Sequence, residues 1–284
     1  GARQPRTVNA GGTRASNVGF DDGGRTIVSS AYPTAGAGKI VLEWRSVEDL
    51  SLLRGLSLDC NVDPNFWGAR SFCAAVELFA LAQSDGRVGV WSTRTGQRLR
   101  TFALPDQLDG RPTVNTGAPL TVISPDGALL AASRMENSQL AVFSIPEDQL
   151  LHSHHVRPLY LVVDRSADPG HLVFLGFSSD SRLLVSTDKT EPGIRLWEAR
   201  TGRPITEPIK PDLGLDAEMS PDGKRILFAG KTAILWDGRV GNALPTPINP
   251  CPVYSVRDVT PDRSRALTTS SRTAQVWDLN HNVR

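Results

Sequence analysis

The chain has 284 residues with 31 basic and 30 acidic side chains, so its net charge of +1 gives no overall field that favours nucleic acid or an anionic membrane. Hydrophobic residues make up 39% and charged residues 21%, which is typical of a globular chain with a sizeable core. The 25 glycines and 20 prolines predict many turns, and they favour an all-β architecture over a helical bundle.

The cysteines and the amino terminus indicate the compartment. Three cysteines, Cys60, Cys73 and Cys251, are too few and too scattered for a disulfide framework or a zinc site, so we expect buried thiols in a reducing environment. No apolar run approaches the roughly 18 to 20 residues of a membrane span, and the first residues lack the apolar stretch of a signal peptide. Since the chain also lacks an initiator Met, we expect residues 1–284 to be a single cytoplasmic domain, without membrane contact, from a longer multidomain protein.

A unit made of an apolar strand, a tight turn and a second apolar strand recurs along the chain. In chain order the copies are VGFDDGGRTIVSS (18–30), TVISPDGALLAAS (121–133), FLGFSSDSRLLVSTD (174–188), AEMSPDGKRILFAG (217–230) and VRDVTPDRSRALTTS (256–270). Gly supplies the positive φ that such turns need, and the positions that follow are apolar. Asp126-Gly127 and Asp222-Gly223 are therefore predicted to be turn residues and not calcium ligands.

An alternating strand that ends on an aromatic residue forms the next part of each unit. These residues are Trp44, Trp91, Phe143, Trp197, Trp236 and Trp277. Subtracting successive positions gives spacings of 47, 52, 54, 39 and 41 residues, which bracket the roughly 40 to 45 residues of a four-stranded propeller blade. Polar turns with Gly at 92–99, 198–205 and 237–244 predict a fourth strand after three of them. Because the aromatic position recurs once per unit, we expect all six side chains in the core.

This unit resembles the repeat of the tryptophan-aspartate (WD) family, whose third strand ends in Trp-Asp. The dipeptide is present at Trp236-Asp237 and Trp277-Asp278, and the family's Gly-His dipeptide is not recognisable in any copy. The resemblance implies an all-β fold, a β-propeller of four-stranded antiparallel blades. The style of the repeats is similar to that of bacterial WD propellers attached to signalling kinases or large ATPases.

Six repeats are recognisable, and the last one stops at VWDLNHNVR after its third strand. Residues 5–8, PRTV, are the candidate for the missing fourth strand. Pairing of the two termini would close the ring and remove its open edges. Seven blades are the alternative, because the stretch from Leu56 to Ala80 fits the repeat poorly and has room for irregular strands.

Catalytic and cofactor signatures are not recognised in the sequence. GAGKI (36–40) differs from a phosphate loop, since Pro33 stands where the motif needs its first Gly and Ile40 where it needs Ser or Thr. The nucleophile-elbow motif G-x-S-x-G and the zinc motif H-E-x-x-H are also missing. We therefore expect no enzymatic activity, no catalytic residues and no cofactor.

Three histidines lie close together in LLHSHHV (150–156), and two residues at alternate positions of a strand share one face. A divalent metal could use such a pair, and the sequence leaves this open. No carboxylate or cysteine stands at a matching spacing, so we favour solvated surface positions for His152, His154 and His155 over a metal site.

In the WD family, the face around the central channel is the usual docking surface for peptides and proteins. By repeat position this face takes the loops 32–38, 84–86, 134–137, 188–191, 230–231 and 270–272. Basic and aromatic residues recur on or near these loops, and Arg, Tyr and Trp are enriched at interface hot spots. The candidate partner-binding residues are Tyr32, Trp67, Arg134, Lys189, Lys231, Tyr254 and Arg272. The alternatives are ordinary solvated loop charge for the basic residues and a core position for Trp67.

We therefore predict an interaction scaffold or sensor propeller that docks a peptide segment or a partner domain, other domains of the same polypeptide included, on its channel face. The alternative is a propeller enzyme or small-ligand-binding module with a site at the channel mouth. That function needs carboxylates or histidines that converge in the channel, whereas the loop carboxylates are scattered. A nucleic-acid partner is not expected, because the basic residues are dispersed and balanced by acids.

Overall fold

The described structure consists almost entirely of β-strands. The computed structural model describes residues 13–21, 25–33, 39–60, 70–73, 76–83, 87–105, 120–134, 139–155, 172–178, 180–188, 193–205, 216–219, 225–229, 233–237, 246–249, 255–259, 265–269 and 274–278. Within these ranges no helix has the length and apolar character needed to cross a membrane.

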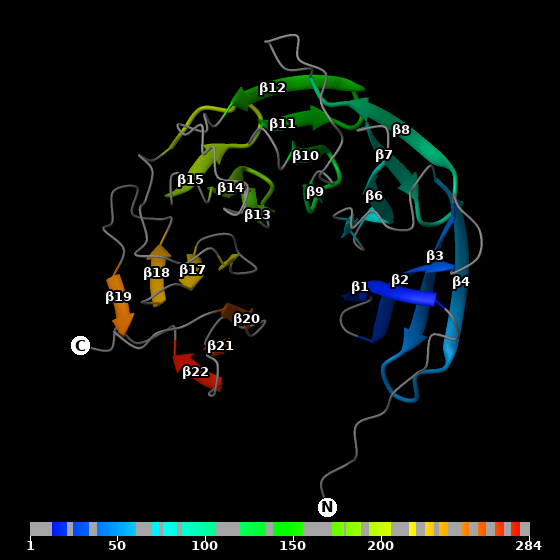
Figure 1. Cartoon of the computed structure of the whole chain (residues 1–284), viewed down its shortest axis with the longest axis horizontal. Helices are drawn as coiled ribbons and strands as arrows, with labels where there is room; N and C mark the ends of the chain where they lie inside the picture. The colour runs from blue at the N-terminus through cyan, green and yellow to red at the C-terminus, as the bar shows by residue number, and fades with distance from the viewer. Residues whose placement is uncertain are drawn as a thin grey trace, which may run out of the picture. The chain divides into compact units, whose positions relative to one another are not determined.

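The strands of the described ranges form six antiparallel sheets, in each of which strands that follow one another in the chain are neighbours (Figure 1). We number these sheets 1 to 6 in chain order. Sheet 1 contains β1 (Thr13–Asp21), β2 (Thr26–Pro33), β3 (Lys39–Ser46) and β4 (Leu52–Asp59). Sheet 2 contains β5 (Arg70–Cys73), β6 (Leu78–Ala82), β7 (Arg87–Ser92) and β8 (Arg98–Ala103). Sheet 3 contains β9 (Leu120–Ile123), β10 (Leu129–Arg134), β11 (Gln139–Ser144) and β12 (Gln149–His155).

The remaining three sheets follow in the same manner. Sheet 4 contains β13 (Leu172–Phe177), β14 (Leu183–Asp188) and β15 (Gly193–Glu198). Sheet 5 contains β16 (Asp216–Met219), β17 (Arg225–Ala229), β18 (Ala233–Asp237) and β19 (Thr246–Asn249). Sheet 6 contains β20 (Ser255–Val259), β21 (Arg265–Thr269) and β22 (Ala274–Asp278). Sheets of three or four antiparallel strands in sequential order are what the WD resemblance implies for single blades.

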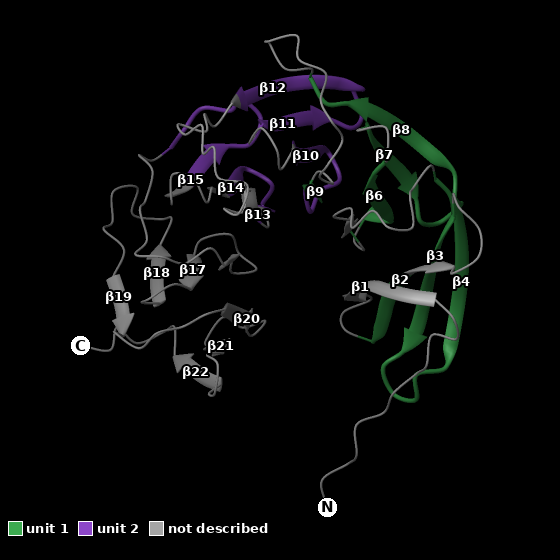
Figure 2. Ribbon diagram, in the orientation of Figure 1, with its two compact units in different colours: residues 1–123 green, residues 124–284 purple. Residues whose placement is uncertain are grey.

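Two compact units, residues 1–123 and residues 124–284, divide the chain (Figure 2). Sheets 1 and 2 belong to the first unit and sheets 4 to 6 to the second. The division falls at the end of β9, so β10 to β12 of sheet 3 belong to the second unit.

The predicted tight turns are present where the structure describes them. In sheet 3 the amide of Gly127 donates to the carbonyl of Ser124 at 2.8 Å, and Gly127 has the expected positive φ of 71°. The carboxylate of Asp126 accepts hydrogen bonds from the Ser124 hydroxyl at 2.6 Å and from the Ala128 amide at 3.0 Å. The prediction that Asp126-Gly127 is turn chemistry is confirmed, while Asp222-Gly223 lies outside the described residues.

The predicted fourth strands are found in part. β8 and β19 follow two of the three polar turns, but the turn at 198–205 is followed in the described residues only by an isolated bridge between Trp197 and Pro204. Sheet 6 has three strands in the described ranges, in line with a repeat that stops after its third strand. Residues 5–8, the predicted fourth strand, lie outside the description. The irregular stretch 56–80 contributes the end of β4, all of β5 and the start of β6, and its described part adds no further sheet.

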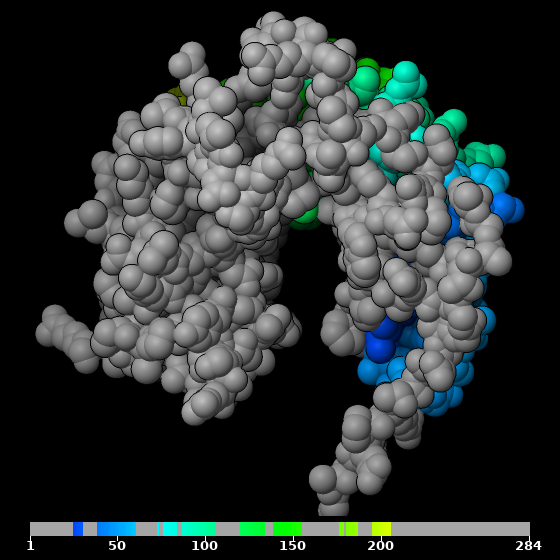
Figure 3. Space-filling model, viewed as in Figure 1, coloured from blue at the N-terminus to red at the C-terminus, as the bar shows by residue number. Residues whose placement is uncertain are grey.

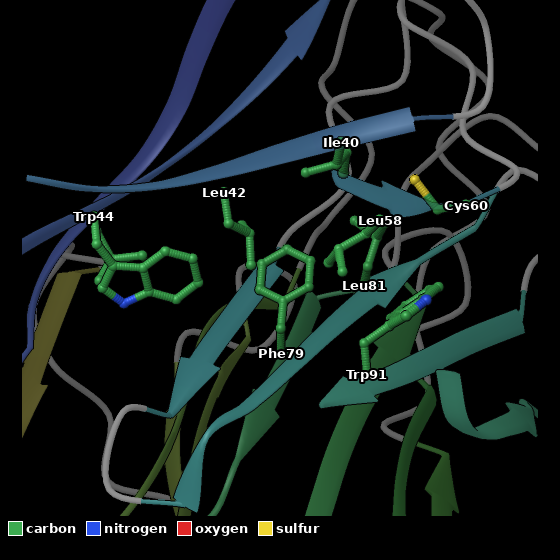
Figure 4. Close-up of a cluster of buried hydrophobic side chains, with 9 residues drawn as sticks. Ile40, Leu42, Trp44, Leu58, Cys60, Phe79, Leu81 and Trp91 are labelled. Carbon is green, nitrogen blue, oxygen red and sulfur yellow. The ribbon is translucent and has the colours of Figure 1, made fainter. Parts of the chain in front are cut away.

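The core of the first unit lies between sheets 1 and 2. Its buried residues are Val28, Ile40, Leu42, Trp44, Leu58, Cys60, Phe79, Leu81 and Trp91, most of which are labelled in Figure 4. The prediction that the strand-ending aromatic residues are core is confirmed for Trp44, Trp91, Phe143 and Trp197, each at most 7% exposed. Trp236 and Trp277 lie in β18 and β22, and their side chains are outside the description.

Trp44 does not occupy the aromatic position of the repeat, which corrects the alignment expected from the sequence. The residue opposite the start of the second strand is Ser46 in sheet 1 and Ser92 in sheet 2. The residue after each serine, Val47 in sheet 1 and Thr93 in sheet 2, donates its amide to the carbonyl of the residue near the start of the second strand. Arg45 is therefore the equivalent of Trp91. Because neighbouring side chains on a strand point to opposite faces, Trp44 faces sheet 2.

A consequence of this shift is that the two faces of β3 differ. Leu42 and Trp44 are buried against sheet 2, whereas the opposite face carries Glu43 and Arg45, which form an ion pair at 2.8 Å and are 32% and 22% exposed. Strands β7 and β11 are buried on both faces along most of their length. The face of sheet 1 that is turned away from sheet 2 thus carries an ion pair and is partly exposed.

Candidate interaction surface

Every sheet has two ends that differ in their connections. Because antiparallel strands alternate in direction, the second and third strands are joined at one end, while the turns between strands 1 and 2 and between strands 3 and 4 lie at the other. We call the first end the loop face and the second end the turn face. The loop face comprises residues 34–38, 83–86, 135–138, 189–192, 230–232 and 270–273. The loops that the sequence analysis assigned to the channel face all fall on or beside these segments.

The structure describes few of the predicted partner-binding residues. Tyr32 lies near the end of β2, opposite Arg14 of β1, and Arg134 is the last residue of β10, opposite Gln139 of β11. The side chains of Tyr32 and Arg134 are not described. The others lie outside the described residues, namely Trp67, Lys189, Lys231, Tyr254 and Arg272. Their common binding role therefore stays a prediction.

The turn face is described in detail, and one hydrogen bond recurs on it. The second residue after the aromatic position donates its amide to the carbonyl that precedes the second strand. The pairs are Thr93 to Glu77 at 2.8 Å, Ile145 to Ala128 at 2.9 Å and Ala199 to Arg182 at 2.8 Å. The donor residues are at most 7% exposed. This bond ties the two turns together in sheets 2, 3 and 4, as the bond of Val47 does in sheet 1.

In the first unit, Arg54 of β4 connects sheet 1 to the turn face of sheet 2. Its guanidinium lies over the Trp44 ring, 4.7 Å from the centroid. Nη2 donates to the carbonyl of Thr93 and, at 2.8 Å, to that of Arg94. A cation stacked on an indole and hydrogen-bonded to two carbonyls stabilises the contact between these sheets.

Exposed apolar side chains stand near Arg54 in the chain, two on the edge strand β4 and one in the turn before it. Leu52, Leu53 and Val47 are 53%, 56% and 39% exposed, and they are three of the six large hydrophobic side chains exposed in the described ranges. The space-filling view shows the described atoms of this part of the chain, in blue, at the surface (Figure 3). Single exposed hydrophobic residues are ordinary, so this patch alone assigns no partner.

In the second unit, His152 and His154 of β12 make the corresponding contact with the turn face of sheet 4. Nε2 of His152 is 2.8 Å from the carbonyl oxygen of Ala199, which is the equivalent of Thr93. The ring of His154 stacks on Trp197 with a centroid distance of 4.7 Å and an interplanar angle of 22°. The two imidazoles lie 5.0 Å apart. The expectation of solvated positions is therefore wrong for both, because the turn of the next sheet covers this strand.

Gly202 completes this contact from the turn of sheet 4. Its φ is 69°, and a Cβ at this position would lie within 3.0 Å of Nε2 of His154 and of Nδ1 of His152. Both of these nitrogen atoms are buried and have no hydrogen-bond partner. Within the described ranges no group of three or more His, Cys, Asp or Glu side chains is arranged to hold a metal.

Burial determines how the two histidines titrate. It lowers the pKa of His152, and the hydrogen bond with Ala199 opposes this shift without cancelling it. Burial also lowers the pKa of His154, and the neighbouring imidazole of His152 lowers it further, while the Gly202 backbone acts in the opposite direction. Both side chains therefore favour the neutral form more strongly than a solvated histidine does.

The sequence analysis missed this contact, although a signal was present. Gly stands five residues after the aromatic position in sheets 2 and 4, as Gly96 and Gly202. Both have positive φ and lie against the fourth strand of the preceding sheet, Gly96 against Leu56 and Gly202 against the histidines. A turn Gly at this fixed offset indicates close packing between neighbouring sheets as well as a turn.

Comparisons with known proteins support the fold. No family model matches the chain, and no curated protein matches it. Among solved structures 1455 chains match. One belongs to the crystal structure of the mitotic checkpoint complex, with a TM-score of 0.61 and 15% sequence identity over 96% of this chain and 76% of that chain. At this identity the likeness shows the fold alone, and the fold is shared over nearly the whole of the present chain.

Proposed function

We propose that this protein is an interaction module that docks a peptide segment or a partner domain on the loop faces of its sheets. The observation that carries the proposal is the equivalent place of six loop segments in six sheets of like topology. A partner could then contact several loops at once. The similar chain belongs to a multi-protein complex, which is compatible with this function.

The chemistry of the loops supports a partner with acidic or polar character. Arg134, Lys189, Lys231 and Arg272 stand on four of the six loop segments or beside them. Arg is enriched at hot spots because its guanidinium donates several hydrogen bonds in a fixed geometry. Tyr32, Trp67 and Tyr254 add aromatic surface in this proposal, while the partner itself stays undefined.

Substitution of the loop basic residues is expected to abolish capture of a partner by the purified domain. The test variant carries Arg134→Glu, Lys231→Glu and Arg272→Glu. The matched control carries Arg94→Glu, Arg182→Glu and Arg200→Glu, which reverse three exposed charges on the turn face. Both variants first need the β-type circular dichroism of the wild type. A partner lost by the test variant and kept by the control supports the proposal, and a partner kept by both contradicts the assignment of the loop face.

We further propose that the six sheets are blades of one ring in which residues 5–8 complete sheet 6. One observation supports closure: sheet 6 has three strands in the described ranges, so its third strand has an open edge there. An unpaired edge of a sheet is unfavourable, so a fourth strand would stabilise sheet 6.

Deletion of residues 1–9 is then expected to lower the thermal unfolding midpoint by several degrees, because sheet 6 loses its fourth strand. Differential scanning calorimetry measures this change. The control is deletion of residues 280–284, which follow β22. Equal midpoints for the wild type and the first deletion would show that the amino terminus does not complete the sheet.

A further inference from the structure

The contact between β12 and the turn of sheet 4 is formed by two histidines, and a second ring proton on either of them would need a hydrogen-bond acceptor. A carbonyl oxygen only accepts, so the hydrogen bond between His152 and Ala199 places the proton of the neutral ring on Nε2. Nδ1 is then unprotonated, and it is buried without a partner. Protonation of His152 would put a donor at Nδ1, beside Gly202, where no acceptor is described.

His154 has the same constraint at its other nitrogen. An imidazolium carries a proton on both nitrogens, so a charged His154 must present a donor at Nε2. This atom is buried beside Gly202 without a hydrogen-bond partner of good geometry, and the Gly202 backbone, which favours the charged ring, offsets the effect of burial only in part. A buried donor without an acceptor is costly, and two imidazolium rings 5.0 Å apart also repel each other.

We propose that His152 and His154 form a pH-sensitive latch that holds the turn of sheet 4 on β12 when both rings are neutral and releases it when they are protonated. The latch closes through the Ala199 carbonyl, the Trp197 ring and the close approach of Gly202. Stacking on Trp197 is favourable for the neutral and for the charged His154 ring, so release follows from the missing acceptor at Nδ1 of His152 and from the repulsion between the two charged rings.

The charged groups around the latch do not offset its protonation. They are Glu147 and Asp148 before β12, Arg182 in the first turn of sheet 4, and Arg195, Glu198, Arg200 and Arg203 on and after β15. The charge that acts on His154 is that of His152. The carboxylate of Glu198 is occupied by Arg203 at 3.4 Å and by the Thr201 hydroxyl at 2.8 Å.

The direction of the pH dependence follows from the lowered pKa of both rings. In the unfolded chain each histidine takes up a proton near its ordinary pKa of 6.5, whereas in the folded chain it does so at a lower pH. The latch therefore contributes its full stability above pH 6.5 and loses it as the pH falls from 6.5 through the lowered folded values.

Hydrogen exchange provides a test with an internal control. The amides of Ala199 and Gly202 report on the latch, and those of Thr93 and Gly96 report on the equivalent turn of sheet 2, which packs against Leu56 and has no histidine. Between about pH 7.5 and about pH 5.5, protection factors at Ala199 and Gly202 are expected to fall about tenfold. Those at Thr93 and Gly96 are expected to stay constant. An equal change in both turns overturns the proposal.

A double variant removes the two titrating imidazoles but keeps the packing of the contact. His152→Gln with His154→Phe keeps a donor for Ala199 and a ring on Trp197, and it is expected to remove the pH dependence at Ala199 and Gly202. The control His281→Gln removes a histidine outside the latch and is expected to keep it. An unchanged pH profile in the double variant overturns the proposal. If that variant does not fold, NMR titration of the wild type decides, since a pKa of 6.5 or above for both rings is incompatible with the latch.

Discussion

Replacing Trp91 by Ala is expected to lower the free energy of unfolding by about 3–5 kcal/mol. Trp91 is 1% exposed and is the largest fully buried side chain among those that the structure describes. It packs against Phe79 with a centroid distance of 6.5 Å, within the cluster that joins sheets 1 and 2. Its removal leaves a cavity that this cluster can fill only in part, so the loss exceeds the transfer free energy of the ring alone.

Urea unfolding followed by circular dichroism measures the effect of this substitution. The control is Leu52→Ala, because Leu52 is 53% exposed on the edge strand of sheet 1 and its replacement is expected to cost no more than roughly 0.5 kcal/mol. Trp91→Phe is expected to fall between the two. Equal costs for Trp91→Ala and Leu52→Ala would show that the cluster between sheets 1 and 2 does not stabilise the fold.

Gly202→Ala is expected to destabilise the protein by about 2–4 kcal/mol, for two reasons that act together. The φ of 69° is unfavourable for a residue with a Cβ. The new methyl group would also lie within 3.0 Å of ring nitrogens of His152 and His154, which cannot withdraw without losing the Ala199 hydrogen bond and the Trp197 stack.

Substitutions at two other glycines distinguish the backbone penalty from the steric contact with the histidines. Gly96→Ala carries a similar backbone penalty, since φ is 75°, but its nearest neighbour is Cδ1 of Leu56 at 3.1 Å, the end of a flexible side chain. It is expected to cost about 1–2 kcal/mol. Gly55→Ala in β4 has nothing within 4 Å and is expected to be neutral or slightly stabilising. Equal losses for Gly202→Ala and Gly96→Ala in thermal unfolding would contradict a tight histidine contact.

Periodic features of the sequence predicted much of the fold. Turn residues such as Asp126 and Gly127 act locally, through hydrogen bonds over two to three positions. Such a turn can therefore be recognised from the short stretch of sequence that forms it. The alignment of Trp44 with Trp91 was wrong by one residue. An aromatic residue near the end of a strand marks the core, but only the pairing register shows which face it occupies.

Contacts between sheets could not be predicted in the same way. His152 and His154 have the alternation of a solvated edge strand, and only the turn of the following sheet makes them half-buried. Arg54 likewise reads as an exposed charge, although it donates to carbonyls some 40 residues further along the chain. For the candidate interaction surface, the sequence located the loops between the second and third strands, while the geometry of their side chains lies outside the described residues.

The ion pair on sheet 1 bears on how such a chain can grow by duplication. Strands β7 and β11 are buried on both faces, so copies of their sheets would pack against a neighbour on either side. Sheet 1 differs from them, because a copy of it beside such a strand would set the ion pair of Glu43 and Arg45 against an apolar surface. Copies of sheets 2 or 3 are therefore better suited than copies of sheet 1 to the addition of new blades.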